Sequence, residues 1–298
     1  MSVPLLSLVV ATVGRTAEVA RLLDSLLAQT GGRFEVLIVD QNPDERLAEI
    51  VMRVSGCGLI VKHLRMSVPN LSLARNAGLN ASRGEFIAFP DDDCWYEPSA
   101  VMHVLQAFNS DPTAQGIVAC WHEQSHAAGR LPTRKPLSLA AWRQFRDGDA
   151  SSISLFFRRS LFDRLGGFDQ RFGVGQWFGA GEETDFVLRA LSAGALIGRE
   201  PAAVVHHHYD KTPIQDWRQG WLLARRRARG TGGLYAKHRL GAYILLRGWL
   251  APLVLTLLRN PTLPALAASA GTCIGRMEGF FRYRRDGNPS PATRGVDP

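Results

Sequence analysis

Residues 86–97 read Phe-Ile-Ala-Phe-Pro-Asp-Asp-Asp-Cys-Trp-Tyr-Glu. The apolar start of this stretch, Phe86 to Phe89, predicts a short buried strand, and three consecutive carboxylates follow it closely. Adjacent negative charges repel one another, so a fold tolerates them at a strand end only when something compensates the charge. Mg²⁺ and Mn²⁺ prefer oxygen ligands and keep coordination positions open for a substrate's phosphates. The stretch therefore predicts a metal site at Asp91–Asp93, and a solvated acidic turn is the plainer interpretation.

The chain around this stretch alternates between strand and helix patterns. Apolar runs at 5–12, 34–39 and 59–64 are typical of buried strands, and helical spacing follows the first two of them. A helix is expected over about 72–81, and the next over 99–109. Such alternation implies right-handed crossovers and an α/β fold with a mostly parallel central sheet and helices on both faces.

Polar residues follow three of these predicted strands. They are the segment from Thr12 to Arg15, the single carboxylate Asp40, and the three aspartates. In parallel sheets, ligands bind beyond the carboxyl ends of the strands, so these groups are expected to line one crevice. Arg75, on the helix that precedes the aspartate strand, could reach the same crevice and contact a phosphate.

A second acidic cluster, Gly181-Glu182-Glu183-Thr184-Asp185, opens a predicted helix over 182–191. Acidic residues in a first helical turn stabilise the helix dipole, which is the structural interpretation. Beside a metal and away from bulk water, a carboxylate can instead act as general base toward an acceptor hydroxyl. Glu182 and Asp185 lie on one face of the helix and Glu183 points about 100° away, so the three cannot share one role.

Two loops are expected to determine substrate specificity. Residues 122–150 are polar, basic and contain proline, which predicts a mobile loop over the crevice. Residues 173–181 are rich in glycine and carry Trp177 and Phe178. We expect these two aromatic side chains to contact the acceptor or to close over the site.

Three consecutive histidines, His206 to His208, stand at the end of a predicted strand over 204–208. In a chain that already holds an acidic cluster, such a run favours a metal or phosphate role over a purely structural one. Side chains alternate along a strand, so His206 and His208 share one face and His207 takes the other. Either the outer pair or the middle histidine points into the crevice.

The net charge of +8 is unevenly distributed along the chain. Residues 211–298 hold 15 Lys and Arg against 4 Asp and Glu, a balance of +11, whereas residues 1–210 hold 20 against 23, a balance of −3. The basic excess accompanies long apolar runs, which indicates an anionic membrane surface rather than a nucleic acid as partner.

The four cysteines have no paired spacing, which indicates free thiols in a reducing compartment, and the N-terminus has no pattern of a secretory signal.

The longest apolar run in the last third is residues 240–258, which Arg247 and Pro252 interrupt. A spanning helix needs about 20 apolar residues with few charges, so we expect helices that lie in the membrane surface. A soluble helical appendage and a single membrane span are the alternatives. The expected organisation is a catalytic domain over 1–235, a basic and apolar helical region over 236–285, and a disordered tail over 286–298.

Taken in order, the motifs closely resemble those of family 2 glycosyltransferases, which have the GT-A fold. The resemblance spans roughly residues 5–211 and rests on Thr12…Arg15, Asp40, Ala74-Arg75-Asn76-Ala77-Gly78, the segment from Gly84 to Asp93, Gly166-Gly167-Phe168-Asp169 and Gly181–Asp185. It implies transfer of a sugar from a nucleotide-diphosphate sugar, with inversion, to a hydroxyl of a glycan or lipid-linked acceptor. Bacterial polysaccharide or glycolipid assembly is the implied setting.

The resemblance also implies roles for individual residues. Asp40 would hold the nucleoside, and the aspartates would form a DXD-type motif that binds Mn²⁺ or Mg²⁺. The implied donor-binding set is Thr12, Arg15, Asp40, Arg75, Asn76, Asp91 and Asp92, and the implied metal ligands are Asp91, Asp93 and, from the histidine run, His208 first and His206 second. Relatives carry Asp as the second member of the late acidic pair. Glu183 stands there in this chain, which makes it the implied base, supported by Glu182 or Asp185.

Two other classes of protein share parts of this pattern. A nucleotide-sugar pyrophosphorylase-type nucleotidyltransferase would need a Gly-rich, basic phosphate loop, and Thr12-Val13-Gly14-Arg15 is too sparse for one. A non-catalytic sugar-binding relative is expected to lose an acidic motif, and this chain keeps both. The expected location is the cytoplasm, at the inner face of the cell membrane.

Overall fold

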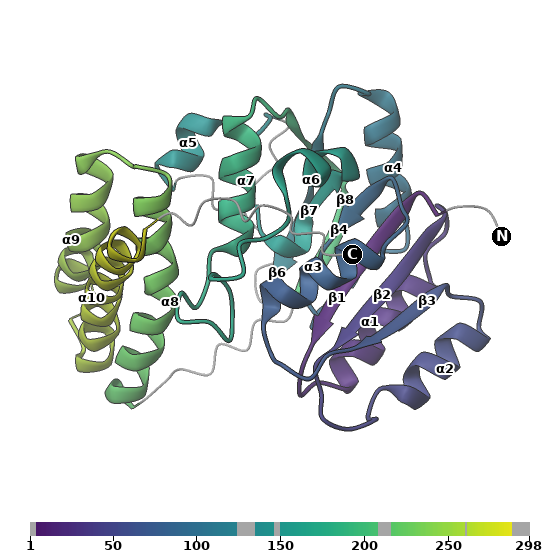
Figure 1. Ribbon diagram of the computed structural model, residues 1–298, viewed down its shortest axis with the longest axis horizontal. Helices are drawn as coiled ribbons and strands as arrows, with labels where there is room; N and C mark the ends of the chain where they lie inside the picture. The colour runs from purple at the N-terminus through teal and green to yellow at the C-terminus, as the bar shows by residue number, and fades with distance from the viewer. Residues whose placement is uncertain (1–3, 124–134, 146–149, 208–215, 260, 288–298) are drawn as a thin grey trace, which may run out of the picture. The chain divides into compact units, whose positions relative to one another are not determined.

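The computed structural model describes residues 4–123, 135–145, 150–207, 216–259 and 261–287 (Figure 1). Eight strands form one sheet in the order β3-β2-β1-β4-β7-β6-β8-β5. Their bounds are β1 (Leu6–Thr12), β2 (Phe34–Asp40), β3 (Val61–Arg65), β4 (Phe86–Ala88), β5 (Cys94–Tyr96), β6 (Gly116–Glu123), β7 (Leu155–Arg158) and β8 (Ile197–His207).

Helices pack on both faces of this sheet, as predicted. Alternate residues of β1 and β2 point to opposite faces, so Leu8 and Ile38 pack in one core and Val9 and Leu37 in the other. The first core includes residues of α1 (Ala17–Leu27), α2 (Ala48–Gly56) and α4 (Ala100–Ser110). The second includes residues of α3 (Leu71–Ala81), α5 (Leu139–Arg143), α6 (Arg159–Leu165) and α7 (Glu182–Ser192).

The sheet is parallel in its N-terminal half and mixed beyond it. β1 pairs in parallel with β2 and β4, and β2 pairs in parallel with β3. β7 is antiparallel to both of its neighbours, β4 and β6, whereas β8 runs parallel to β6. The sequence did not predict β5, a three-residue strand that pairs antiparallel with β8. This short pairing matters because it brings the residue after Asp93 opposite His207.

The chain divides into two compact units, Met1–Gln170 with Glu183–Lys211, and Arg171–Glu182 with Thr212–Pro298. The second contains three long helices, α8 (Trp217–Lys237), α9 (Ala242–Arg259) and α10 (Leu263–Asp286). The boundary predicted near 236 falls inside this unit, at the end of α8, because α8 packs along α10. The tail predicted over 286–298 lies almost wholly outside the described residues.

Glycines allow α8 and α10 to pack with their backbones nearly touching. A Cβ atom on Gly271, Gly275 or Gly279 of α10 would lie 2.5, 2.2 or 2.0 Å from the carbonyl oxygen of Trp221, Arg225 or Arg229 of α8. The constant offset of 50 residues shows that the two helices run parallel. Glu278 adds a charged contact, since it pairs with Arg225 and, at 2.9 Å, with Arg229. The hydrogen bond from Arg225 is the main cause that lowers the pKa of Glu278 below its ordinary value.

We predict that Gly275→Ala destabilises this helical unit. The new methyl group would meet the Arg225 carbonyl, so the helices must separate, which costs about 1–3 kcal/mol. Thermal unfolding followed by circular dichroism measures the effect. Gly56→Ala in α2 is the control, because nothing lies within 4 Å of the Cβ position there. Equal melting temperatures for the two variants would contradict this account of the packing.

Candidate functional site

The three predicted polar segments meet at one edge of the sheet. Thr12 ends β1, Asp40 ends β2 in register with Thr12, and Asp91 forms a parallel bridge with Ala11. Thr12, Asp40 and Asp92 are all buried. The three segments therefore converge as the strand-end reasoning predicted, and their role as a binding site stays a prediction.

Asp92 connects this edge to the segment after β1. The Thr12 hydroxyl donates to Asp92 Oδ2 at 2.6 Å, and the Arg15 guanidinium pairs with Asp92 Oδ1. Burial raises the pKa of Asp92 above its ordinary value, and the bonds from Thr12 and Arg15 only partly oppose this. Asp92 thus acts as an acceptor within the fold, which leaves its two neighbours to face the crevice.

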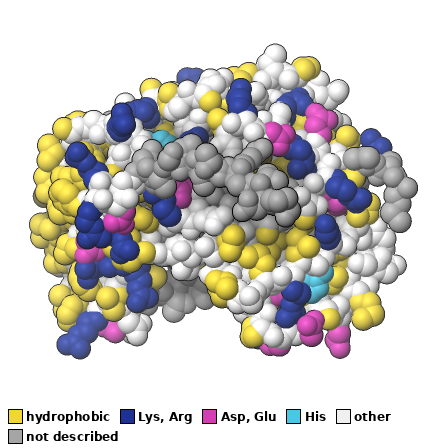
Figure 2. Space-filling view, viewed as in Figure 1, with side chains coloured by type: hydrophobic (Ala, Val, Ile, Leu, Met, Phe, Trp, Pro, Cys, Tyr) yellow, Lys and Arg dark blue, Asp and Glu magenta, His cyan; other side chains and the backbone are white. Residues whose placement is uncertain are grey.

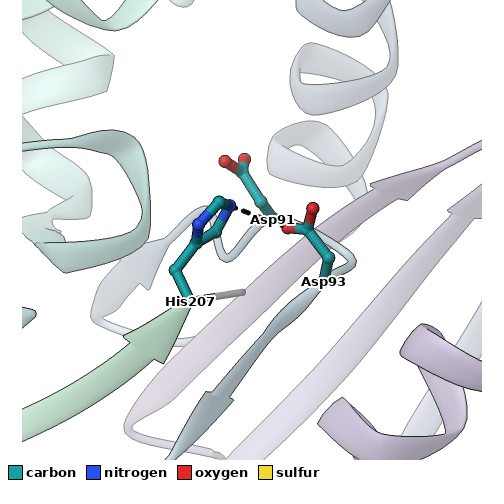
Figure 3. A group of neighbouring side chains, drawn as sticks. All are labelled: Asp91, Asp93 and His207. Atoms are coloured by element: carbon teal, nitrogen blue, oxygen red, sulfur yellow. Dashed lines mark ion pairs between the residues drawn. The ribbon is translucent and has the colours of Figure 1, made fainter. Parts of the chain in front are cut away.

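Asp91, Asp93 and His207 form the group best arranged to hold a cation (Figure 3). One ligand atom from each lies within 4.8 Å of the other two. His207 Nε2 lies 3.1 Å from Asp93 Oδ1, because the pairing of β5 with β8 sets Cys94 opposite His207. Carboxylate oxygens with one imidazole nitrogen suit Mn²⁺, and oxygen ligands suit Mg²⁺.

Electrostatics at this cluster favour an ion pair when no metal competes. Burial opposes ionisation of Asp93, but the hydrogen bond and charge of His207, together with the charge of Arg15, lower its pKa overall. The hydrogen bond to Asp93 raises the pKa of His207, against the opposing effect of burial. Below this raised pKa, a cation that binds at the site must displace a proton from His207.

The structure places His207, and not His206, at the cluster. His206 is on the other face of β8, where its Nε2 lies 2.6 Å from Glu97 Oε1 and its ring stacks on Trp95. This corrects the expectation for His206, and the alternation of side chains along the strand is the reason. His208, the first choice from the resemblance, lies outside the described residues.

Arg75 is the buried cation of the site. Only 2% of its side chain is exposed, and its Nη2 lies 2.8 Å from Asp91 Oδ1. The hydroxyl of Ser152 lies 3.3 Å from both oxygens of the same carboxylate. Sequence reasoning missed Ser152, since nothing in the sequence around it marks a functional residue.

Asn76 has a different environment from the one expected. Its side-chain amide donates to the Phe168 carbonyl and accepts from the Phe168 amide, each at 2.8 Å. One position along a helix turns a side chain by about 100°, so Asn76 faces away from its neighbour Arg75. A Cβ atom on Gly167 would lie 2.3 Å from Asn76 Oδ1, so glycine is required beside this contact. Asn76 therefore holds the 166–168 turn, and both of these side-chain bonds are made there.

Asp40 is fully buried and surrounded by donors. His63 Nε2 lies 2.9 Å and Arg65 Nη1 lies 3.2 Å from Asp40 Oδ2, and the backbone and side-chain amides of Asn42 both donate to Oδ1. Arg65 is opposite Asp40 in the pairing of β2 with β3. Sequence reasoning missed His63 and Arg65, although their position at the end of the next predicted strand was a usable signal.

The late acidic cluster separates as the helical geometry predicted. Glu183 lines a pocket with Arg75 and Ser152, whose other walls are apolar: Phe89, Leu155, Phe157, Phe168 and Phe186. Because Arg75 and Ser152 also bond to Asp91, this pocket adjoins the acidic cluster.

Asp185 is fully buried and pairs with Arg189 at 2.9 Å. Arg189 in turn donates to the carbonyls of Leu165 and Gly167, which indicates a structural role for Asp185. Glu182 is buried, and only 5% of it is exposed.

Trp177 and Phe178 belong to the unit that contains the C-terminal helices. Two guanidinium groups contact the Trp177 ring, Arg229 at 4.5 Å and Arg282 at 4.2 Å from its centre. Phe178 is buried against Phe172 and Tyr283. The expectation of an acceptor contact or lid is therefore wrong for Phe178, because its ring is part of a core. Trp177 remains half-exposed.

The 171–182 segment is also held through its backbone. A Cβ atom on Gly230 of α8 would lie 1.9 Å from the carbonyl oxygen of Ala180, so the helix and the segment are in direct contact. Arg171 Nη2 donates to the Tyr283 hydroxyl at 2.8 Å. Helices α8 and α10 thus determine the conformation of the segment that runs directly into Glu183.

Comparison with protein families gives a match over residues 7–166, more than half of the chain, to the family described as glycosyl transferase family 2. An uncharacterized glycosyltransferase of Haemophilus influenzae is 34% identical over 113 residues, which are 38% of this chain and 37% of that protein. The putative glycosyltransferase EpsH of Bacillus subtilis is 32% identical over 36% of this chain and 31% of its own length. The matched region thus spans about a third of each of these curated relatives.

Solved structures resemble a much larger part of the chain. The mannosyltransferase PcManGT from Pyrobaculum calidifontis, in complex with GDP-Man and Mn²⁺, has a TM-score of 0.63 at 17% identity, over 96% of this chain and 89% of that one. TarS 1-349 of S. aureus, in complex with UDP-GlcNAc, has a TM-score of 0.58 at 14% identity, over 94% and 92%. At these identities the likeness establishes the fold alone.

We predict that His207→Ala weakens binding of Mn²⁺ by about tenfold or more, since even outer-shell partners of metal ligands have effects of 10–100-fold. His206→Ala is the matched control and should bind Mn²⁺ as the wild type does. Calorimetric titration measures both. A larger loss in His206→Ala would overturn the placement of the histidines.

The same titrations repeated at several pH values test the proton competition. The pKa of His207 is raised from 6.5 by Asp93, so its proton competes with the metal until the pH exceeds that raised value. Affinity for Mn²⁺ in the wild type should rise with pH across this range. His207→Ala should show a weaker dependence, and an identical pH dependence in both proteins would contradict the competition.

Proposed function

We propose that this chain, which belongs to glycosyl transferase family 2 and has the GT-A fold, is a glycosyltransferase that acts with a divalent metal. In this proposal it transfers a sugar from a nucleotide-diphosphate sugar, with inversion, to a hydroxyl of a glycan or lipid-linked acceptor. The observation that carries the proposal is the convergence of Asp91, Asp93 and His207 beside a pocket that contains Glu183.

The proposed metal ligands are Asp91, Asp93 and His207, and the proposed cation is Mn²⁺ or Mg²⁺. When bound, the cation would offset the negative charge that develops on the leaving diphosphate. Arg75 supports the same role from the protein side, because its buried guanidinium already bonds to Asp91. A Mn²⁺ complex of one structural relative agrees with this assignment.

The donor is proposed to bind along the strand ends. Asp40 is the proposed contact to the nucleoside. Because it is fully buried and bonded to His63, Arg65 and Asn42, a nucleoside would have to replace one of these donors. Arg15 pairs with Asp92 and Asp93 and can exchange these partners for donor phosphates. Complexes of structural relatives with UDP-GlcNAc and GDP-Man support a nucleotide-sugar donor as a class.

Glu183 is the proposed general base. Its carboxylate lies in a pocket with largely apolar walls, next to the groups that bond to Asp91, where it can take the proton of an acceptor hydroxyl. Asp185 is proposed to support it indirectly, through Arg189 and the 165–167 turn. Family membership favours glycosyl transfer over nucleotidyl transfer and over a non-catalytic sugar-binding role.

The acceptor is proposed to be lipid-linked or membrane-proximal, in polysaccharide or glycolipid assembly at the inner face of the cell membrane. The support is the excess of 11 positive charges in residues 211–298 and the apolar surface of α9. α9 is the one helix among the described residues that is long and apolar enough to cross a membrane.

The test of the proposed function is a screen of nucleotide-sugar donors that follows release of nucleoside diphosphate, with Mn²⁺, with Mg²⁺ and with EDTA. A donor consumed in the presence of a divalent cation and spared in EDTA is the expected result. Full turnover in EDTA would contradict the metal role. Absence of turnover with every donor class would contradict the donor assignment.

We predict that Glu183→Gln lowers turnover about 10²-fold or more, because the amide keeps the shape of the side chain and cannot accept the proton. Donor affinity, measured by calorimetry, should persist. Glu182→Gln is the neighbouring control and should retain more activity. If Glu182→Gln is instead the inactive variant with intact donor binding, the base is Glu182.

A further inference from the structure

Helix α9 presents an apolar surface along its whole length. Among its residues, only Ile244 and Gly248 are buried. Figure 2 shows hydrophobic side chains gathered at the left edge of the view, over α9. The exposed residues that line one side of α9, here called the outer stripe, are Tyr243, Leu246, Leu250, Val254, Leu257 and Leu258. An exposed apolar stripe of this length is typical of a surface that binds a membrane or another protein.

Charge is segregated along the α9–α10 pair. The sequence from Gly248 to Gly275 contains a single charged residue, Arg259, where the two helices are joined. The two helices are antiparallel, because Arg276 contacts Gly248 and Ser269 contacts Thr256. Arg247 and Arg276 therefore lie at the same height along the axes of the helix pair. The half of the pair that lies nearer the connection between α9 and α10 is nearly uncharged.

The hydroxyl groups of Thr256, Ser269 and Thr272 are satisfied within the helix pair, whereas the indole N–H of Trp249 is buried without a hydrogen-bond partner among the described residues. Thr256 Oγ1 lies 2.6 Å from Ser269 Oγ and donates to the Pro252 carbonyl, and the Thr272 hydroxyl donates to Ala268. Pro252 has no N–H, so the carbonyl of Gly248 loses its helical partner. Arg276 Nη1 donates to that carbonyl at 2.7 Å. Such internal pairing is what a hydrocarbon environment requires.

The length of the uncharged half of α9 limits how deeply it can reach into a bilayer. Gly248 to Leu258 is 11 residues, or about 16 Å of helix at 1.5 Å per residue. The hydrocarbon core of a bilayer is about 30 Å thick. The uncharged part therefore matches one leaflet and is too short for a span between Arg247 and Arg259.

We propose that α9 inserts obliquely into one leaflet of a phospholipid bilayer, with its C-terminal end deeper. Tyr243, Arg247 and Arg276 then lie at the level of the headgroups. The inference rests on the proposed membrane location of the enzyme and replaces helices lying flat in the surface by a tilted insertion.

A lipid leaflet fits this surface better than a second copy of the chain. Arg226 and Arg227 of α8 and Arg284 and Arg285 of α10 are exposed in the same unit. These charges complement anionic headgroups. A second copy would bring the same positive charges together.

Binding to vesicles of phosphatidylcholine and phosphatidylglycerol tests the insertion. Leu250→Glu and Leu257→Glu change residues that are 55% and 53% exposed, so folding should be preserved. Each should lower the partition coefficient in co-sedimentation about tenfold or more. Met52→Glu in α2, at a residue that is 71% exposed, is the matched control and should bind as the wild type does.

Equal binding of all these proteins would overturn the insertion. An α9 variant that changes only the oligomeric state in size-exclusion chromatography would assign the outer stripe to a second copy, which also overturns it. Release of diphosphate from the donor in lipid-free solution is measured on the same preparations. Loss of insertion and failure of the proposed catalysis are thereby distinguished.

Depth along α9 is measured with nitroxide labels at Tyr243→Cys and Leu257→Cys, in the full chain with Cys57→Ser and Cys120→Ser. Cys94 and Cys273 are buried and stay in place. Oxygen and nickel accessibility should place the label at 257 deeper than the label at 243. Equal depths would overturn the tilt, and reaction of the 257 label with a reductant trapped inside the vesicles would indicate a span instead.

Discussion

The mutual repulsion of three consecutive carboxylates is the constraint on which this site depends. Two like charges about 4 Å apart cost about 4 kcal/mol at the effective dielectric of a protein surface. Each member of Asp91–Asp93 therefore has compensating partners: Arg75 for the first, Thr12 and Arg15 for the second, and Arg15 with His207 for the third. These partners come from α3, β1, the segment after β1, and β8. Because each of these carboxylates needs a partner, this one turn of the chain holds together elements that are distant in sequence.

The parts that could be predicted from sequence depend on local pattern. A buried run followed by a polar residue marks a strand end, and parallel strands bring such ends to one edge. Thr12, Asp40 and Asp91–Asp93 were located in this way, without knowledge of strand order. The same reasoning gave the angular separation of Glu183 from Asp185, because that separation is a property of any helix.

The parts that could not be predicted depend on pairings between distant segments. The alternation of side chains along a strand left open whether the outer pair of histidines or the middle one faces the crevice. Only the register between β5 and β8 selects His207. Phe178 was interpreted as a lid residue because an aromatic residue in a Gly-rich loop looks the same whether exposed or buried. Its burial depends on Tyr283, more than 100 residues later in the chain. The packing of α8 with α10 could not be predicted for the same reason, since contacts between distant helices leave no local signal in the sequence.

The attachment of the 171–182 segment to α8 and α10 has a consequence for the order of synthesis. Trp177 is held by Arg229 and Arg282, and Arg171 by Tyr283. A ribosome adds about 5–20 residues per second, so roughly 5–20 s separate the emergence of Arg171 from that of Arg282. During this interval the sheet can form, but the segment that leads into Glu183 has no partner to hold it. The 171–182 segment, which precedes the proposed base in sequence, therefore reaches its final packing only after α10 has emerged.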